Sequence, residues 1–169
     1  MKKSILLLAI FFIGLTSVKA QVYPSTVGLR GSVGNYGIGP ELSYQHGLGD
    51  LNRAEVGLAL GTDNNFNRFG VTGAFHWVGE VQSGFSWFAG PGAQVWLYSF
   101  NTGINRHQLV SNGSAVGGAV GAHIGVEYDF DEELGLPFTA SVDSRPMFNF
   151  VKYYSGFEFA VGISIRYTF

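Results

Sequence analysis

The sequence predicts an all-β protein: an eight-stranded antiparallel up-and-down transmembrane β-barrel, preceded by a cleaved signal peptide. Three observations predict it. The final residues, 157–169, alternate without a break between apolar side chains and polar or small ones, which is the period of a strand. The chain holds 25 Gly and 15 Phe, which favour strands with close backbone approaches and aromatic belts. After residue 20 there is no run of 18 apolar residues, so membrane-spanning helices are excluded.

The first twenty residues have the pattern of a secretory signal peptide. Two lysines follow the initial methionine, residues 4–15 form an apolar run, and Val18 and Ala20 are the small residues of a cleavage site. A run of about a dozen residues is shorter than the roughly 20 that a helix needs to cross a bilayer. We therefore expect residues 1–20 to be removed and residues 21–169 to form the barrel domain.

The charge of the mature chain argues against a nucleic-acid partner. Three of the ten basic residues lie in the expected signal peptide, which leaves seven basic against twelve acidic residues, a net charge of −5. No basic patch remains that could follow a phosphate backbone. The chain also has no cysteine, so it is neither a disulfide scaffold nor a protein with a cysteine-linked lipid anchor.

Eight segments with a period of two follow one another, separated by clusters of Gly, Asn and Asp that mark turns. Most reach or exceed the nine to eleven or so residues that a tilted strand needs to cross the bilayer. In chain order, the predicted strands are 24–34, 37–47, 52–62, 68–79, 84–98, 114–128, 137–149 and 157–169.

Each of these strands is justified by one apolar face, which we expect to point outward to lipid. The outward residues, strand by strand, are Val27, Leu29 and Val33; Ile38, Leu42 and Tyr44; Val56, Leu58 and Leu60; Phe69, Val71, Phe75 and Trp77; Phe85, Trp87, Val95 and Leu97; Val116, Val120, Ile124 and Val126; Phe138, Val142, Phe148 and Phe150; and Phe157, Phe159, Val161, Ile163, Ile165, Tyr167 and Phe169.

Nearly every charged residue inside a predicted strand lies on the opposite, inward phase. Four are positive and five negative, and an eight-stranded barrel is only wide enough for side chains to fill its interior, so we predict a lumen network of paired charges. We expect Asp143 and Arg145 to pair across the ladder with Glu158 and Arg166 of the next strand. The predicted network comprises Arg30, Glu41, Arg53, Glu55, Glu127, Asp143, Arg145, Glu158 and Arg166.

An even number of strands places both ends of the barrel on one side, the periplasmic side for an exported chain. The longest connection, 99–113, then faces the outside and is the expected surface for a protein partner of unknown identity. The segment 129–135 faces the periplasm and is expected to be a solvated turn. Tyr167 and Phe169 lie where outer-membrane barrels carry the C-terminal assembly signal, so the barrel-insertion machinery and outer-membrane lipids are expected partners.

The stretch YDFDEELGLPFTASVDSRP at 128–146 resembles a pattern of the small eight-stranded outer-membrane β-barrel family of Gram-negative bacteria. It is similar in particular to the single-domain barrels of the Bacteroidota, with an architecture like that of OmpX and OmpW. The resemblance implies an integral protein of the cell outer membrane, and the family has no single activity. The matching residues are Tyr128, Phe130, Pro137, Ser141, Asp143, Arg145 and Pro146.

No catalytic, cofactor-binding or metal site is predicted. His76 and His123 fall on the inward phase, but no strand carries two histidines at i and i+2, and the chain has no cysteine. Ser144 and His46 are the only pair of polar residues on the lipid-facing phase, and no acid accompanies them, so an enzyme that modifies lipid A is the less favoured alternative. The glycine-rich stretches precede strands rather than helices, so they are expected to relieve crowding inside the barrel, not to bind phosphate.

The favoured function is that of a non-enzymatic barrel with a packed lumen, which acts structurally or binds through its surface loops. One alternative is a conduit for small hydrophobic molecules, as in OmpW-like barrels, because inward Phe88, Trp96 and Tyr98 form an aromatic patch. Another is an accessory subunit of an envelope complex.

Overall fold

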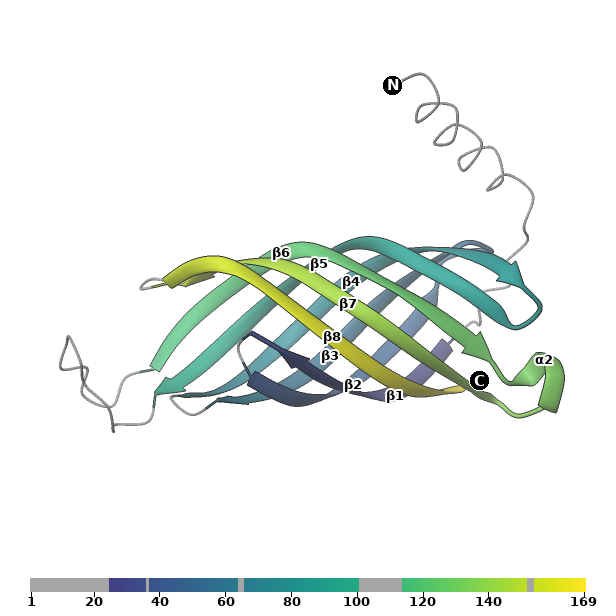
Figure 1. Ribbon diagram of the computed structural model, residues 1–169, viewed down its shortest axis with the longest axis horizontal. Coiled ribbons are helices and arrows are strands. Elements are labelled where there is room, and N and C mark those ends of the chain that lie inside the picture. The colour runs from purple at the N-terminus through teal and green to yellow at the C-terminus, as the bar shows by residue number, and fades with distance from the viewer. Residues whose placement is uncertain (1–24, 36, 64–65, 101–113, 152–153) are drawn as a thin grey trace, which may run out of the picture.

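The computed structural model describes residues 25–35, 37–63, 66–100, 114–151 and 154–169 (Figure 1). The expected signal peptide and residues 101–113 of the long connection lie outside the described residues. The elements are β1 (Ser25–Gly34), β2 (Gly37–Gly47), β3 (Asn52–Asp63), β4 (Phe66–Gln82), β5 (Phe85–Phe100), β6 (Ser114–Asp129), α2 (Asp131–Leu134), β7 (Phe138–Val151) and β8 (Tyr154–Thr168).

The strands form one closed barrel in sequence order, and every neighbouring pair is antiparallel. The barrel closes where β1 pairs with β8, from Thr26 opposite Thr168 to Gly34 opposite Ala160. Figure 1 shows the strands inclined to the long axis, with α2 and the C-terminus at the same end. The predicted eight-stranded antiparallel barrel is confirmed.

The strand bounds lie within a few residues of the predicted ones, and β2 coincides with its prediction. The connection between β6 and β7 is exposed to solvent as predicted, but it contains a short helix, α2, which was not predicted. Three acidic residues occupy the first turn of α2, where the helix dipole favours negative charge. Gly135 then ends the helix with φ 63° and donates its N–H to the Asp131 carbonyl at 3.0 Å.

Within the described ranges, no helix is both long and apolar enough to cross a membrane.

The outer surface of the barrel is apolar along all eight strands. Leu29 is 62% exposed and Ile163 is 67% exposed, whereas Arg166 on the other phase of β8 is only 1% exposed. In water, so large an apolar surface would be unfavourable, whereas in a bilayer it faces lipid. The strands therefore span a membrane, with their charged residues inside.

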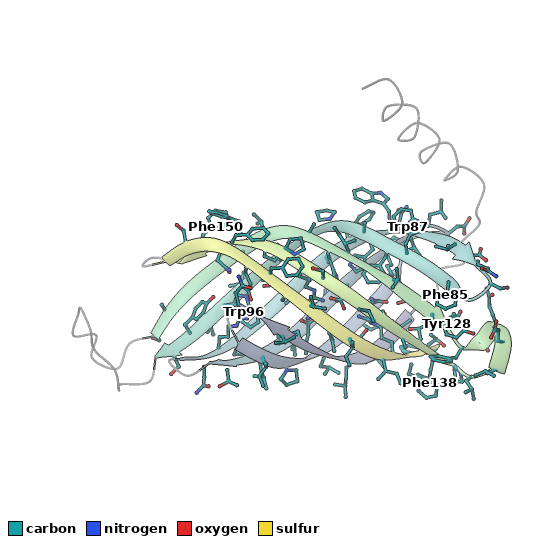
Figure 2. The ribbon with its side chains drawn as sticks, in the orientation of Figure 1. Phe85, Trp87, Trp96, Tyr128, Phe138 and Phe150 are labelled. Carbon is teal, nitrogen blue, oxygen red and sulfur yellow. The ribbon has the colours of Figure 1, made fainter. Side chains whose placement is uncertain are left out.

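Aromatic side chains gather at both ends of this apolar surface. Phe85, Tyr128 and Phe138 lie toward the α2 end, and Phe150 lies toward the opposite end (Figure 2). Aromatic rings of membrane barrels concentrate at the two membrane–water interfaces. Phe148 packs against Phe150, with ring centroids 5.1 Å apart. These rings therefore indicate where the two interfaces cross the barrel.

Candidate functional site

The interior of the barrel is filled by charged side chains. All nine residues of the predicted network face the lumen, and none is more than 9% exposed. The structure adds Arg68 of β4, whose side chain is also 9% exposed and pairs with Glu158. The buried lumen charges of the described residues are therefore five arginines and five carboxylates, in balance.

Arg145 of β7 is at the centre of this network. Its Nη1 donates to Glu41 of β2 at 2.6 Å, and its Nη2 donates to Glu55 of β3 at 2.7 Å. Gln45 completes the Glu55 carboxylate with a hydrogen bond of 2.6 Å. These bonds cross the lumen from one wall to the other, so one guanidinium connects three strands.

Arg30 of β1 forms a bidentate pair with Asp143 of β7. Nε donates to both carboxylate oxygens, at 2.9 and 3.0 Å, and Nη2 lies 2.5 Å from Oδ1. Gly162 of the intervening β8 makes room for the pair, because a Cβ there would stand 2.5 Å from Arg30 Cζ. The absence of a side chain at this position is what allows the guanidinium to reach across β8.

The remaining pairs extend the network toward both ends of the barrel. Arg68 lies over the ring of Trp96, 4.2 Å from its centroid, and donates to Glu158 at 2.9 Å. Arg53 donates to Glu127 at 2.8 Å. The Arg68–Glu158 pair thus lies apart from the Arg145 bridge, whereas Glu127 has a second arginine neighbour, Arg166.

Arg166 joins the network from β8. It lies 3.5 Å from a Glu55 oxygen and 3.9 Å from a Glu127 oxygen. It also donates to the Ser141 hydroxyl at 3.0 Å and contacts Ser164. One arginine therefore connects carboxylates of β3 and β6.

The expected pairing across the β7–β8 ladder is wrong. The register places Asp143 opposite Gly162 and Arg145 opposite Ala160, and no acid of either strand stands opposite a base of the other. The physical reason is the width of the barrel: an arginine reaches the far wall of an eight-stranded barrel, so closure of the sheet decides its partner.

Two histidines that the sequence placed inward but did not join lie in direct contact. His76 Nε2 of β4 and His123 Nδ1 of β6 are 2.8 Å apart. Gly90 of β5 stands directly opposite His123 of β6. It is also level with His76 of β4, because the β4–β5 register pairs Ala74 with Gly92 and Trp77 with Ala89. Because Gly90 has no side chain, the two imidazoles meet over it. Only the inward phase of the two histidines could be predicted from the sequence, whereas their contact depends on the register of β5.

Glu55 brings a third group of the kind that binds metals to within 4.8 Å of the two histidines. The nearby donors do not favour a cation, however. Arg145 binds the Glu55 carboxylate, and Arg53 Nε approaches His76 Nδ1 at 3.3 Å. Arginine carries a fixed positive charge, so a divalent cation here would be repelled and would have to displace existing hydrogen bonds.

The aromatic patch that suggested a hydrophobic conduit is covered. Phe88 is fully buried beneath His76 and His123, with ring centroids 4.9 and 5.2 Å away, and Trp96 lies under Arg68. Two cavities lined by residues such as Trp96, Arg68 and Arg145 have volumes of about 30 and 10 Å³. Space of that size holds one or two waters, not an apolar ligand.

Ser144 and His46, the lipid-facing polar residues considered for the less favoured enzyme alternative, do not lie together. His46 of β2 lies 3.3 Å from the Ser25 hydroxyl and 3.4 Å from the Tyr44 hydroxyl. Ser144 is on β7, opposite Ile124 and Val161, and two strands separate it from β2. The closed barrel therefore keeps Ser144 and His46 apart.

The two aromatic residues of the predicted assembly signal lie on the outer surface at the α2 end. Tyr167 is 45% exposed and Phe169 is 61% exposed. Tyr167 packs edge-on against Phe138 of β7, with ring centroids 5.6 Å apart. Both rings are thus open to lipid or to another protein.

An eight-stranded membrane-spanning barrel whose lumen is closed by its own side chains is the class that this fold and site define. Among solved structures, the chain is similar to neisserial surface protein A, with 13% identity and a TM-score of 0.61 over 86% of this chain and 96% of that one. It is also similar to the N-terminal β-barrel domain of OprF from Pseudomonas aeruginosa, with 17% identity and a TM-score of 0.62 over 88% and 100%. At these identities the likeness establishes the fold of small outer-membrane barrels. No family model and no curated protein matches the chain.

Proposed function

We propose that this protein is an integral outer-membrane barrel that does not conduct, and that it acts structurally or as a binding module through its surface. The observation that carries the proposal is the bridge from Arg145 to Glu41 and Glu55, which joins opposite walls of the lumen. A water-filled path through the centre would require these charges to separate. Breaking a buried ion pair by removing one partner typically costs about 3 to 5 kcal/mol, so such opening is rare at equilibrium.

Conductance across a planar bilayer tests this proposal. The wild-type protein at neutral pH is expected to give no stable open channel. A variant with Arg145→Ala and Glu41→Ala removes the bridge and keeps the lumen charges in balance, because Glu55 retains Arg166 and Gln45. It is expected to raise the leak current. Migration of the unboiled variant in a detergent gel checks that it has folded. Long-lived openings of porin size in the wild type would refute the proposal.

The compartment follows from the same proposal. An exported chain with a signal peptide of residues 1–20 and a terminal aromatic pair is suited to delivery to the outer membrane, and exposed Tyr167 and Phe169 suit contact with the insertion machinery. Replacing both by alanine should reduce the amount of folded barrel in the outer-membrane fraction. Unchanged insertion would remove the assembly role from this pair.

The connection 99–113 is the proposed binding surface for a protein partner. It joins β5 and β6 at the end opposite to α2, the end that faces outside if the barrel termini are periplasmic. Cross-linking on intact cells, compared between the wild type and a variant with residues 101–113 replaced by a short Gly–Ser linker, would identify a partner. Co-purification from mild detergent would separate this role from that of an accessory subunit in a larger complex.

We place the protein, within this proposal, among the single-domain barrels of the Bacteroidota type, and propose that it is not an enzyme. The first rests on the residues of 128–146 that resemble that group. The second rests on Ser25, Tyr44 and His46, a polar cluster with no carboxylate among its hydrogen-bond partners. Mass spectrometry of lipid A and phospholipids from cells with and without the protein would detect an acyl-chain change and so oppose the second proposal.

A further inference from the structure

The two lumen histidines form a hydrogen-bonded chain with a fixed direction. Arg53 Nε lies 3.3 Å from His76 Nδ1, and His76 Nε2 lies 2.8 Å from His123 Nδ1. His123 Nε2 then lies 3.2 Å from an oxygen of Asp143. His76 is fully buried and His123 is 1% exposed, so water does not compete for these nitrogens.

The direction follows from the chemistry of arginine. A guanidinium donates and cannot accept, so His76 Nδ1 must be the acceptor and carries no proton. In a neutral imidazole the proton is then on Nε2, which donates to His123 Nδ1. His123 therefore also carries its proton on Nε2, which lies 3.2 Å from an Asp143 oxygen but outside hydrogen-bond geometry. Both rings are neutral, and each nitrogen has a defined role.

An additional proton has no favourable position on this chain. On His76 Nδ1 it would face the Arg53 N–H group, and on His123 Nδ1 it would face the N–H of His76 at 2.8 Å. Either position turns a hydrogen bond into two opposed donors. Protonation therefore requires the two rings to separate or to turn.

The surrounding charges do not remove this conflict. Arg53 and Glu55 of β3 face the pair from one side, and Asp143 and Arg145 of β7 face it from the other. Each acid is already engaged, Glu55 by Arg145 and Asp143 by Arg30. Phe88 of β5 closes the remaining side with an uncharged ring.

We propose that the His76–His123 pair is an acid-sensitive lock: it holds the lumen side chains together while both rings are neutral, and it loosens the barrel when the pH falls. This inference goes beyond the proposed function and does not depend on it, because the absence of conductance at neutral pH can hold whether or not the lock exists. No local sequence motif reveals this contact, because the two histidines are on β4 and β6, 47 residues apart.

The size of the effect follows from linkage between protonation and folding. An unfolded histidine takes up its proton near pH 6.5, whereas in the folded barrel a proton would first have to break the hydrogen bond between the two rings. Lowering the pH from 7 to 5 then favours the unfolded state by roughly 25-fold for one histidine, and by several hundredfold for two. Stability is therefore full above about pH 7 and decreases as the pH falls, before most carboxylates lose their charge near pH 4.

The first experiment compares denaturant unfolding in lipid vesicles at pH 7 and pH 5. The wild type should lose several hundredfold in its folding equilibrium constant, and the double variant His76→Phe with His123→Phe should lose almost none. His46→Phe is the matched control, because His46 is on the outer surface of β2, and it should behave like the wild type. Equal pH dependence in the wild type and the double variant would overturn the proposal.

The second experiment observes the rings directly and does not require a variant to fold. Nitrogen-15 spectra of the labelled wild-type histidines should show two neutral rings with the proton on Nε2 at pH 7. These two signals should remain neutral at pH 6. A charged ring at pH 7, or a proton on Nδ1 of either buried histidine, would overturn the proposed chain.

Discussion

Arg145 cannot exchange its carboxylate partners for water as a solvent-exposed arginine can. It is 4% exposed, and both its terminal nitrogens are bound to carboxylates. Replacing it with alanine would leave Glu41 and Glu55 without their main counter-charge. A buried charge that loses its partner typically costs about 3 to 5 kcal/mol. The lumen network therefore depends strongly on this one side chain.

We accordingly expect Arg145→Ala to lower the free energy of unfolding by about 3 to 5 kcal/mol. The control is Val161→Ala on the outer face of β8, which loses only part of one apolar contact with lipid, roughly 1 kcal/mol. Urea titration of both variants in lipid vesicles measures the difference. If Arg145→Ala unfolds like the control, the lumen is hydrated and the conduit alternative becomes the better one.

Arg30 and Asp143 allow a test of coupling between two strands that are not neighbours. Their bidentate pair predicts that Arg30→Ala and Asp143→Ala are each destabilising, and that the double variant is less destabilised than the sum of the two, by about 0.5 to 3 kcal/mol. Urea titration of the wild type, the two single variants and the double variant provides the complete double-mutant cycle. Additive effects would mean that the two charges are screened from each other by water.

At the scale of the strand, inward glycines make room for large side chains on the neighbouring strand. Gly70 of β4 faces Trp96 of β5, and a Cβ at Gly70 would lie 2.7 Å from Trp96 Cδ2. Trp96 cannot move away easily, because Arg68 covers its ring and its Nε1 donates to Gln94 at 3.0 Å. Gly73 is on the outer face of the same strand, and a Cβ added there would meet nothing within 4 Å beyond its chain neighbours.

The expected result is that Gly70→Ala destabilises the barrel by about 1 to 3 kcal/mol through overpacking. Gly73→Ala is expected to be neutral or to stabilise by up to about 1 kcal/mol, because alanine restricts the unfolded chain. Thermal or urea unfolding of the two variants in the same detergent provides the comparison. Equal stability would show that Trp96 adapts and that the glycines are not needed for packing.

The strands were predictable from the sequence because a period of two is a local property. The alternation in β8 and the charged phase of β7 gave the face of each residue correctly, and Glu158 and Arg166 do face the lumen. Arg68 was also on the inward phase, at the first position of the predicted fourth strand, but it was not included in the predicted network. The sequence signal for Arg68 was therefore present.

The partners within the lumen were not predictable in the same way. Asp143 binds Arg30 and Arg145 binds Glu41 because the sheet closes into a barrel, and closure sets which walls face each other. The contact between His76 and His123 depends in addition on the register of β5, which brings Gly90 level with both. Sequence periodicity shows which residues point into the lumen, whereas the closed barrel determines which of them pair with each other.

At the scale of the whole molecule, closure rests on the seam between the first and last strands. Leu29 of β1 and Ile165 of β8 stand directly opposite each other, and both point outward. Opposite residues of an antiparallel pair have Cα atoms about 4.5 to 5.5 Å apart, which is within the range that a disulfide bridges. Because the chain contains no cysteine, a pair introduced here can react only with each other or with another molecule.

We therefore expect the variant Leu29→Cys with Ile165→Cys to form an intramolecular disulfide when the folded barrel is oxidised in vesicles. The bond would join the two ends of the barrel domain into a large loop, which changes the migration of the boiled, unreduced chain in a denaturing gel. The control is Leu29→Cys with Val95→Cys, because Val95 is on β5, four strands away around the ring and on the opposite outer wall. If the seam pair does not cross-link, or if the control pair does so equally well, the barrel is not closed between β1 and β8, and the lumen network that depends on closure would have to be abandoned with it.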